Sequence, residues 1–73
     1  MKLPILKSKE VLKTLEKAGF YIDHQSGSHI TLLNDVAKKR VTLPSHSKDI
    51  KKGTLHSIIK QSGLTLEEFM KQR

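Results

Sequence analysis

The chain has 73 residues, which is enough for one small domain spanning residues 1–73 and too short for a separate cofactor-binding domain. It contains no Cys, which excludes disulfides and thiolate metal sites and suits the reducing cytoplasm, where we expect the protein to reside. Fourteen Lys and Arg against seven Asp and Glu give a formal charge of +7, so the expected partner is a polyanion, most often nucleic acid.

The first predicted element is an amphipathic helix over residues 8–18. Ser8 is a favourable N-cap, and Gly19 is a suitable C-terminal stop. Between them the apolar residues recur at helical spacing: Val11, Leu12, Leu15 and Ala18. The predicted solvent side carries a stripe of lysines four residues apart: Lys9, Lys13 and Lys17.

Three β-prone segments follow, over residues 20–25, 29–33 and 39–43. Turn residues separate them: Ser26-Gly27-Ser28 after the first and Asn34-Asp35 after the second. Pro44 ends the third. Two hairpins in series predict a three-stranded antiparallel meander.

The alternation of side chains along each strand predicts which residues share a face. If Ile30 and Leu32 face the helices, then His29 and Thr31 lie on the opposite, open face. The same alternation places Ile22 on the helix side of the first strand. It puts four further residues on the open face: Tyr21, Asp23, Arg40 and Thr42.

The polar residues 45–52 predict a loop, after which a second amphipathic helix is expected and Gly63 closes it. Its apolar residues are Leu55, Ile58 and Ile59. Thr65 and Glu68 fit a capping box, so a short last helix should begin there. The order α-β-β-β-α with a short terminal helix indicates an α+β fold, one sheet with helices on one face.

His29 is the main candidate for catalysis. It follows the small turn residues Gly27 and Ser28 at the start of a strand, on a face that also carries a cation and hydroxyls. An imidazole in that position would suit a general base acting on a nucleic-acid backbone. His46 follows Pro44 and would supply a second imidazole at the same end of the sheet. The alternative at both positions is a histidine without a catalytic role.

Residues 48–54 place basic side chains before a helix whose first N–H groups lack partners. Lys48, Lys51, Lys52 and Thr54 would form a phosphate seat with the positive end of the helix dipole. The segment lacks the spacing of a Walker loop, so we do not expect it to bind a nucleoside triphosphate. The alternative is a solvated cluster of charge.

The order of these motifs resembles that of the HicA toxin family. The likeness is carried by Gly27-Ser28-His29, Val41-Thr42-Leu43-Pro44 with His46, Lys52-Gly53-Thr54-Leu55, and the residues from Ile58 to Gly63. The segment from Ser8 to Gly19 and the closing Glu67-Glu68-Phe69 also fit. The resemblance therefore covers nearly the whole chain.

The resemblance implies a double-stranded-RNA-binding-domain-like fold with a three-stranded antiparallel sheet and a short C-terminal helix. It further implies the toxin of a type II toxin–antitoxin system, neutralised by a HicB-like antitoxin protein. Its implied activity is that of a metal-independent endoribonuclease that cleaves mRNA without a cofactor. The family's catalytic His carries over to His29, and His46 becomes a candidate auxiliary acid or base. Six further residues are expected to contact RNA: Ser28, Arg40, Lys48, Lys51, Lys52 and Thr54.

The chain departs from the family pattern before Arg40, where Lys38-Lys39 stands in place of the usual short turn containing Gly. This departure concerns the shape of the second hairpin. A non-catalytic RNA-binding module of the same fold, reading shape and phosphates, is the alternative function. A membrane role is not expected, since the chain has no run of 18 apolar residues and no interfacial Trp.

Overall fold

The computed structural model describes residues 4–45 and 48–73 and confirms the predicted α+β order. The three strands form one antiparallel sheet in the order β1-β2-β3, as a meander requires. A short C-terminal helix follows the second long helix, as expected. The elements are α1 (Ser8–Lys17), β1 (Tyr21–Ser26), β2 (His29–Asn34), β3 (Lys39–Pro44), α2 (Lys52–Ser62) and α3 (Leu66–Gln72).

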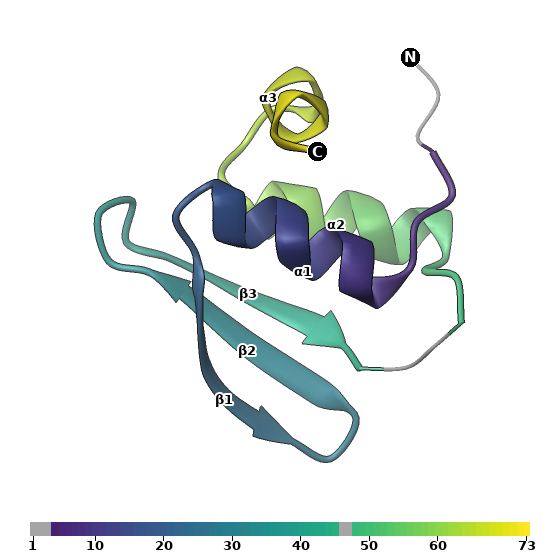
Figure 1. Cartoon of the computed structure of the whole chain (residues 1–73), viewed down its shortest axis with the longest axis horizontal. Helices are drawn as coiled ribbons and strands as arrows, with labels where there is room; N and C mark the ends of the chain where they lie inside the picture. The colour runs from purple at the N-terminus through teal and green to yellow at the C-terminus, as the bar shows by residue number, and fades with distance from the viewer. Residues whose placement is uncertain (1–3, 46–47) are drawn as a thin grey trace.

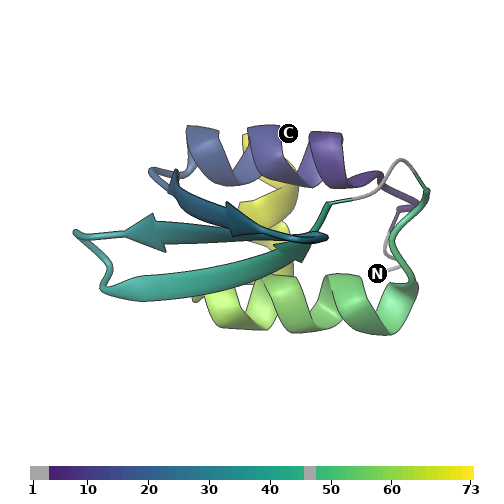
Figure 2. The ribbon, with the colours of Figure 1, turned by 90° about the horizontal axis from the view of Figure 1, so that it is seen from below.

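The sheet lies below the two longer helices in Figure 1, with α3 above them. The helices α1 and α2 run in the same direction, and the strands lie between them in the projection of Figure 2. Both helices contact β3, with α2 packed along it, whereas β1 is the strand farthest from α2. The sheet is therefore covered unevenly from one edge to the other.

The core forms where the helices meet the inner side of β2 and β3. Buried apolar side chains come from every helix and from these two strands: Val11, Leu15, Ile30, Leu32, Val41, Leu43, Leu55, Ile58, Ile59 and Phe69. Phe69 on α3 is completely buried. Truncating a buried Phe to Ala costs about 3–5 kcal/mol, roughly the whole stability expected of so small a core. The short α3 is thus part of the core.

The first strand departs from the predicted alternation, because every residue of β1 is exposed. Ile22 pairs with Leu32 in the register of the inner face, yet its side chain remains 45% exposed. This edge strand is therefore less covered than β2 and β3, each of which has buried residues. A β-bulge between Ile22 and His24 also interrupts the alternation, so strict alternation does not hold for the residues beyond that point.

Thr31 lies on the open face, as the alternation predicts, yet its side chain is buried. Its register partners His24 and Thr42 lie on that face, but Thr31 itself is only 6% exposed. The side chain is short and stands on the central strand, with a residue of a neighbouring strand on each side. Burial on an uncovered sheet face therefore depends on the position of the strand in the sheet.

The start of α1 also differs from the prediction. Lys7 is the N-cap residue, and its backbone N–H donates to the Glu10 carboxylate at 3.3 Å. Ser8 is the first helical residue and is buried, and its hydroxyl donates to the carbonyl of Pro44 at 2.5 Å. The hydroxyl expected to cap the helix instead ties α1 to the end of β3.

Candidate active site

The turn before β2 places His29 at the end of the sheet. Ser26 pairs directly with His29, so the turn consists of Gly27 and Ser28 alone. Gly27 has φ 58°, a left-handed value that a type II′ hairpin turn requires at its first central residue and that Gly adopts without strain. The Gly-Ser pair thus fixes His29 as the first residue of β2, where it is exposed.

A hollow of about 480 Å³ opens beside His29. One side of it is formed by the strands, through His29, Thr42 and Pro44. The other side is formed by the segment before α2 and by α2 itself, through Lys48, Asp49, Ile50, Lys51, Thr54 and Gln61. The hollow carries an imidazole, two ammonium groups and one carboxylate, so its charge with a neutral imidazole is positive.

The segment that carries Lys48 and Lys51 is fixed to the core through Ile50. Ile50 is buried, and its backbone N–H donates to the carbonyl of Leu6 at 2.8 Å. Lys7 and Asp49 form an antiparallel bridge beside this bond. Because Leu6 and Ile50 are both in the core, the exposed Lys48 and Lys51 project from a fixed stretch of backbone.

In residues 4–45 and 48–73, no side chain caps the start of α2. Lys51 is the N-cap residue, with extended backbone angles and no side-chain hydrogen bond to the helix, and the first turn contains no acidic residue. The first N–H groups of a helix attract anions, and basic side chains beside them add to that attraction. With Lys51 and Thr54 lining the hollow, this helix start offers a seat for a phosphate group.

Gln61 holds α2 against the edge of the sheet. Its side-chain oxygen accepts a hydrogen bond from the backbone N–H of Thr42 at 3.1 Å. Its side-chain nitrogen donates to the hydroxyl of Ser57 at 3.1 Å, one turn back along α2. The Gln61 amide therefore gives an edge N–H of β3 a hydrogen-bond partner. It also links the two sides of the hollow, one formed by the strands and the other by α2.

Four of the predicted site residues come together in the hollow: His29, Lys48, Lys51 and Thr54. Ser28 is exposed in the turn beside it, and its carbonyl accepts a bond from the backbone N–H of Ser45. Lys52 is the exposed first residue of α2 and does not line the hollow. His46 lies outside the described residues.

Arg40 shares the open face with His29 but lies at the other end of the strands, and its contact with RNA stays a prediction. The register pairs His29 with Pro44 and Arg40 with Leu33. Pro44 and Arg40 are four residue steps apart along β3, which is about 13 Å at the usual rise per residue. Sharing a face by alternation does not bring two residues to the same end of a sheet.

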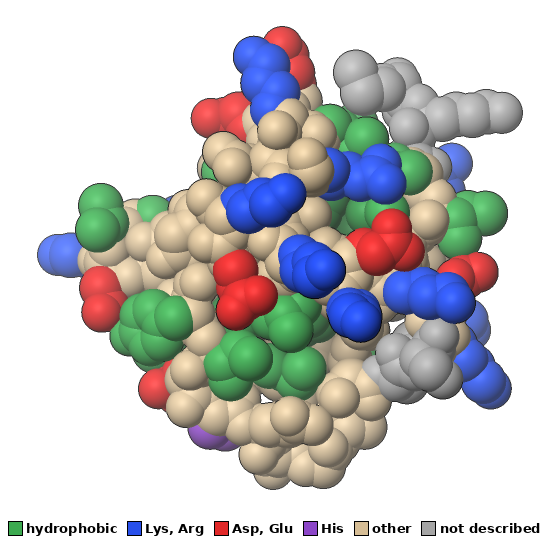
Figure 3. Space-filling model, in the orientation of Figure 1, with side chains coloured by type: hydrophobic (Ala, Val, Ile, Leu, Met, Phe, Trp, Pro, Cys, Tyr) green, Lys and Arg blue, Asp and Glu red, His purple; other side chains and the backbone are tan. Residues whose placement is uncertain are grey.

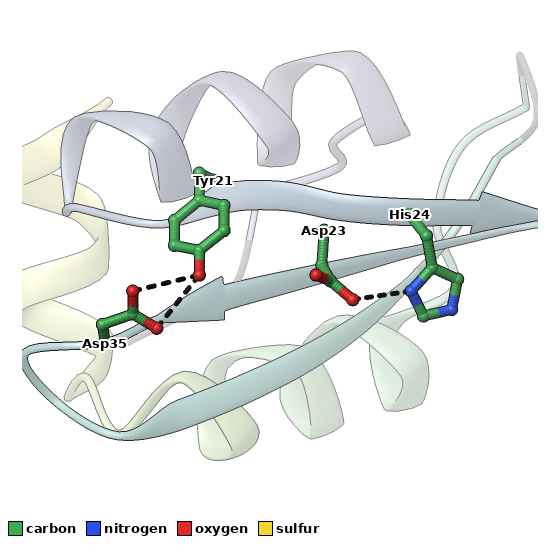
Figure 4. Close-up of polar contacts among 4 residues, drawn as sticks. All are labelled: Tyr21, Asp23, His24 and Asp35. Atoms are coloured by element: carbon green, nitrogen blue, oxygen red, sulfur yellow. Dashed lines mark hydrogen bonds and ion pairs between the residues drawn. The ribbon is translucent and has the colours of Figure 1, made fainter.

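The exposed strand β1 carries a second group of polar contacts, drawn in Figure 4. The Tyr21 hydroxyl donates to both carboxylate oxygens of Asp35, at 3.0 and 3.1 Å. This bond raises the pKa of Tyr21, since ionisation would destroy it. Nearer the other end of the strand, the Asp23 carboxylate lies 2.8 Å from Nδ1 of His24.

Basic side chains also gather away from the hollow. Figure 3 shows Lys and Arg over the face on which α1 lies, with acidic side chains among them. The exposed lysines of α1 are Lys9, Lys13 and Lys17. Positive charge alone therefore does not distinguish the hollow from the rest of the surface. The hollow differs in having positive charge beside an imidazole and beside the start of α2.

Comparison with known protein families places the fold and the hollow in context. A family model described as the HicA toxin of bacterial toxin–antitoxin systems matches residues 8–64. The match begins at the first residue of α1 and ends just after α2, so it includes every residue that lines the hollow. No curated protein matches the chain. Within residues 4–45 and 48–73, no helix has the length and apolar character needed to cross a membrane.

Proposed function

Because this chain belongs to the HicA toxin family of bacterial toxin–antitoxin systems, we propose that it is a metal-independent endoribonuclease that cleaves mRNA in the cytoplasm. The observation that carries the proposal is the meeting of His29 with Lys48, Lys51 and the uncapped start of α2 in one hollow. An exposed imidazole next to a phosphate seat is the minimum that RNA cleavage needs from a protein.

The chemistry follows from the substrate. RNA carries its own nucleophile, the 2′-hydroxyl, so a base that removes its proton starts an attack on the neighbouring phosphorus. In our proposal neutral His29 takes that proton and the O2′–P bond forms as the P–O5′ bond breaks. The products are a 2′,3′-cyclic phosphate and a 5′ oxygen that leaves and takes up a proton. The lysine side chains and the helix N–H groups stabilise the charge that develops on the phosphate oxygens. General-base catalysis contributes about 10²–10⁴-fold, so the enzyme should be slow.

The direct test is incubation of the purified protein with RNA in the presence of EDTA. We expect cleavage that leaves 2′,3′-cyclic phosphate ends, and its loss in His29→Ala. His56→Ala is the matched control, because His56 is an exposed histidine on α2 outside the hollow. A folded His29→Ala protein that cleaves at the wild-type rate would contradict the proposal. RNA binding without cleavage by the wild type would instead favour a non-catalytic RNA-binding module.

A toxin of this kind must be silenced in its own cell, and we expect a HicB-like antitoxin to cover the hollow. The basic hollow favours a partner with an acidic surface, which also accelerates capture at low salt. Diethyl pyrocarbonate should therefore modify His29 in the free toxin and not in the complex. Equal reaction in both states would mean that the partner acts away from His29.

A further inference from the structure

A second histidine lies close to His29 on the open face of the sheet. The register pairs Ser26 with His29 and His24 with Thr31, without irregularity between these two pairs. His24 and His29 are therefore diagonal neighbours on one face, and such residues lie about 7–8 Å apart. That spacing allows two imidazoles to reach opposite sides of one phosphate group.

The β-bulge is what brings His24 to this face. Tyr21 pairs with Leu33 and Ile22 with Leu32, and strict alternation from there would turn His24 inward. Asp23 is the extra residue between the two regular stretches, so His24 is returned to the face of Tyr21. Figure 4 shows Tyr21, Asp23 and His24 all leaving β1 on the same side. Bulges commonly redirect a side chain next to an active site.

Asp23 orients the imidazole of His24. The Asp23 carboxylate lies 2.8 Å from Nδ1 of His24. An ionised carboxylate can only accept a hydrogen bond, so Nδ1 is the donor and Nε2 remains available to a substrate. The His24 side chain is 52% exposed, so RNA can reach it. A carboxylate that fixes a histidine in this way is a recurrent arrangement for acid–base catalysis.

We propose that His24 is the general acid of the reaction, held in place by Asp23, with His29 as the general base; this rests on the proposed ribonuclease function. As His29 takes the 2′-hydroxyl proton and the O2′–P bond forms, the P–O5′ bond breaks. The 5′ oxygen receives its proton from Nε2 of the His24 imidazolium. The products are a 2′,3′-cyclic phosphate and a 5′-hydroxyl, and exchange with solvent restores both histidines.

The positions of the other groups agree with this division of roles. The lysines and the start of α2 approach His29 from the β3 side, because the hollow is lined by Thr42 and Pro44 of that strand. His24 stands on β1, on the other side of β2. A phosphate over His29 would thus have the cations on one side and the proton donor on the other.

The test compares two substrates that differ in the leaving group. One is an oligonucleotide with a single ribonucleotide; the other has sulfur in place of the bridging 5′ oxygen at the same position. A thiolate leaves without protonation at neutral pH, since thiols have a pKa of about 8.5. We expect His24→Ala to slow cleavage of the oxygen substrate by about 10²-fold or more. It should change cleavage of the sulfur substrate by less than about 10-fold, whereas His29→Ala slows both.

Two further measurements separate catalysis from structure. His24→Ala and His24→Gln should keep the wild-type circular dichroism spectrum, as should the His56→Ala control. Asp23→Asn should slow cleavage of the oxygen substrate only, because it weakens the acid step. Equal rates of His24→Ala and wild type on the oxygen substrate would overturn the proposal, as would equal losses on both substrates. A wild type inactive on both would overturn the ribonuclease function itself.

Discussion

Two helices of this chain, α2 and α3, begin in opposite ways. At α3 the hydroxyl of Thr65 accepts from the backbone N–H of Glu68, and the Glu68 carboxylate accepts from the backbone N–H of Thr65, at 3.0 and 2.9 Å. The first turn of α3 also contains two acidic residues, whereas that of α2 contains none and its N-cap residue is a lysine. The protein satisfies the start of α3 internally, whereas no side chain of the described residues caps the start of α2, where we expect an external anion to bind.

The difference shows how the same backbone feature can serve stability in one place and binding in another. A capping box typically stabilises a helix by about 1 kcal/mol. At α2 that stabilisation is absent, and Lys48 and Lys51 add repulsion to the positive end of the dipole. A phosphate bound there would relieve both costs at once. The four variants below test this comparison.

The largest effect should come from removing the cations of the hollow. Lys48→Ala/Lys51→Ala should weaken RNA binding by about tenfold or more and reduce the slope of log affinity against log salt by roughly 1–2 units. Lys9→Ala/Lys13→Ala on α1 removes the same amount of charge from the other basic face. This pair should change neither the cleavage rate nor the slope of log affinity against log salt. Equal effects of the two pairs would mean that binding depends on net charge alone.

Removing the cap of α3 should affect stability only. Thr65→Ala deletes the acceptor of the Glu68 N–H, so the free energy of unfolding should fall by about 1 kcal/mol in urea titrations. The folded variant should cleave RNA as the wild type does, because α3 lies outside the hollow. A loss of activity larger than the loss of folded protein would show that the two helix starts are coupled.

Much of this architecture could be predicted from local sequence. The capping box at Thr65 and Glu68, the turn at Gly27-Ser28 and the position of His29 all depend on residues close together in the chain. Lys38 adopts φ 55°, so a lysine occupies the left-handed turn position where Gly is usual. The hairpin forms despite the departure from the family pattern.

The remaining features depend on register and packing, which local patterns do not encode. The bulge at Asp23 adds one residue to β1, so alternation could not place His24 on the open face. Gln61 bonds Thr42 because α2 lies along the edge of β3, a contact between residues 19 apart in sequence. Arg40 shares the open face with His29 but stands at the far end of the strand. Each of these features depends on tertiary position.

The third variant converts the start of α2 into one like that of α3. Lys51 occupies the N-cap position with φ −63° and ψ 147°, which suits a capping hydroxyl. Lys51→Ser should therefore stabilise the protein by about 0.5–1 kcal/mol while slowing RNA cleavage. Urea titration and cleavage rates on the same preparation check both parts. A variant that gains stability and keeps full activity would show that the uncapped start has no part in binding.

The smallest effect concerns the charge of Glu68 and its dependence on pH. The hydrogen bond from the backbone of Thr65, followed by the bond with the Thr65 side chain, holds the pKa of Glu68 below its ordinary value of 4.5. A lowered pKa in the folded state means that the ionised carboxylate stabilises the fold above that ordinary value. The contribution is then lost as the pH falls through the folded pKa.

Glu68→Gln keeps a side chain able to form the capping box but removes the charge. Its melting temperature should therefore lie slightly below that of the wild type at about pH 7, and the two should converge at about pH 2. A difference that persists unchanged in acid would mean that Glu68 acts through its shape and hydrogen bonds alone. The charge at the start of α3 would then not be the counterpart of the anion that we expect at the start of α2.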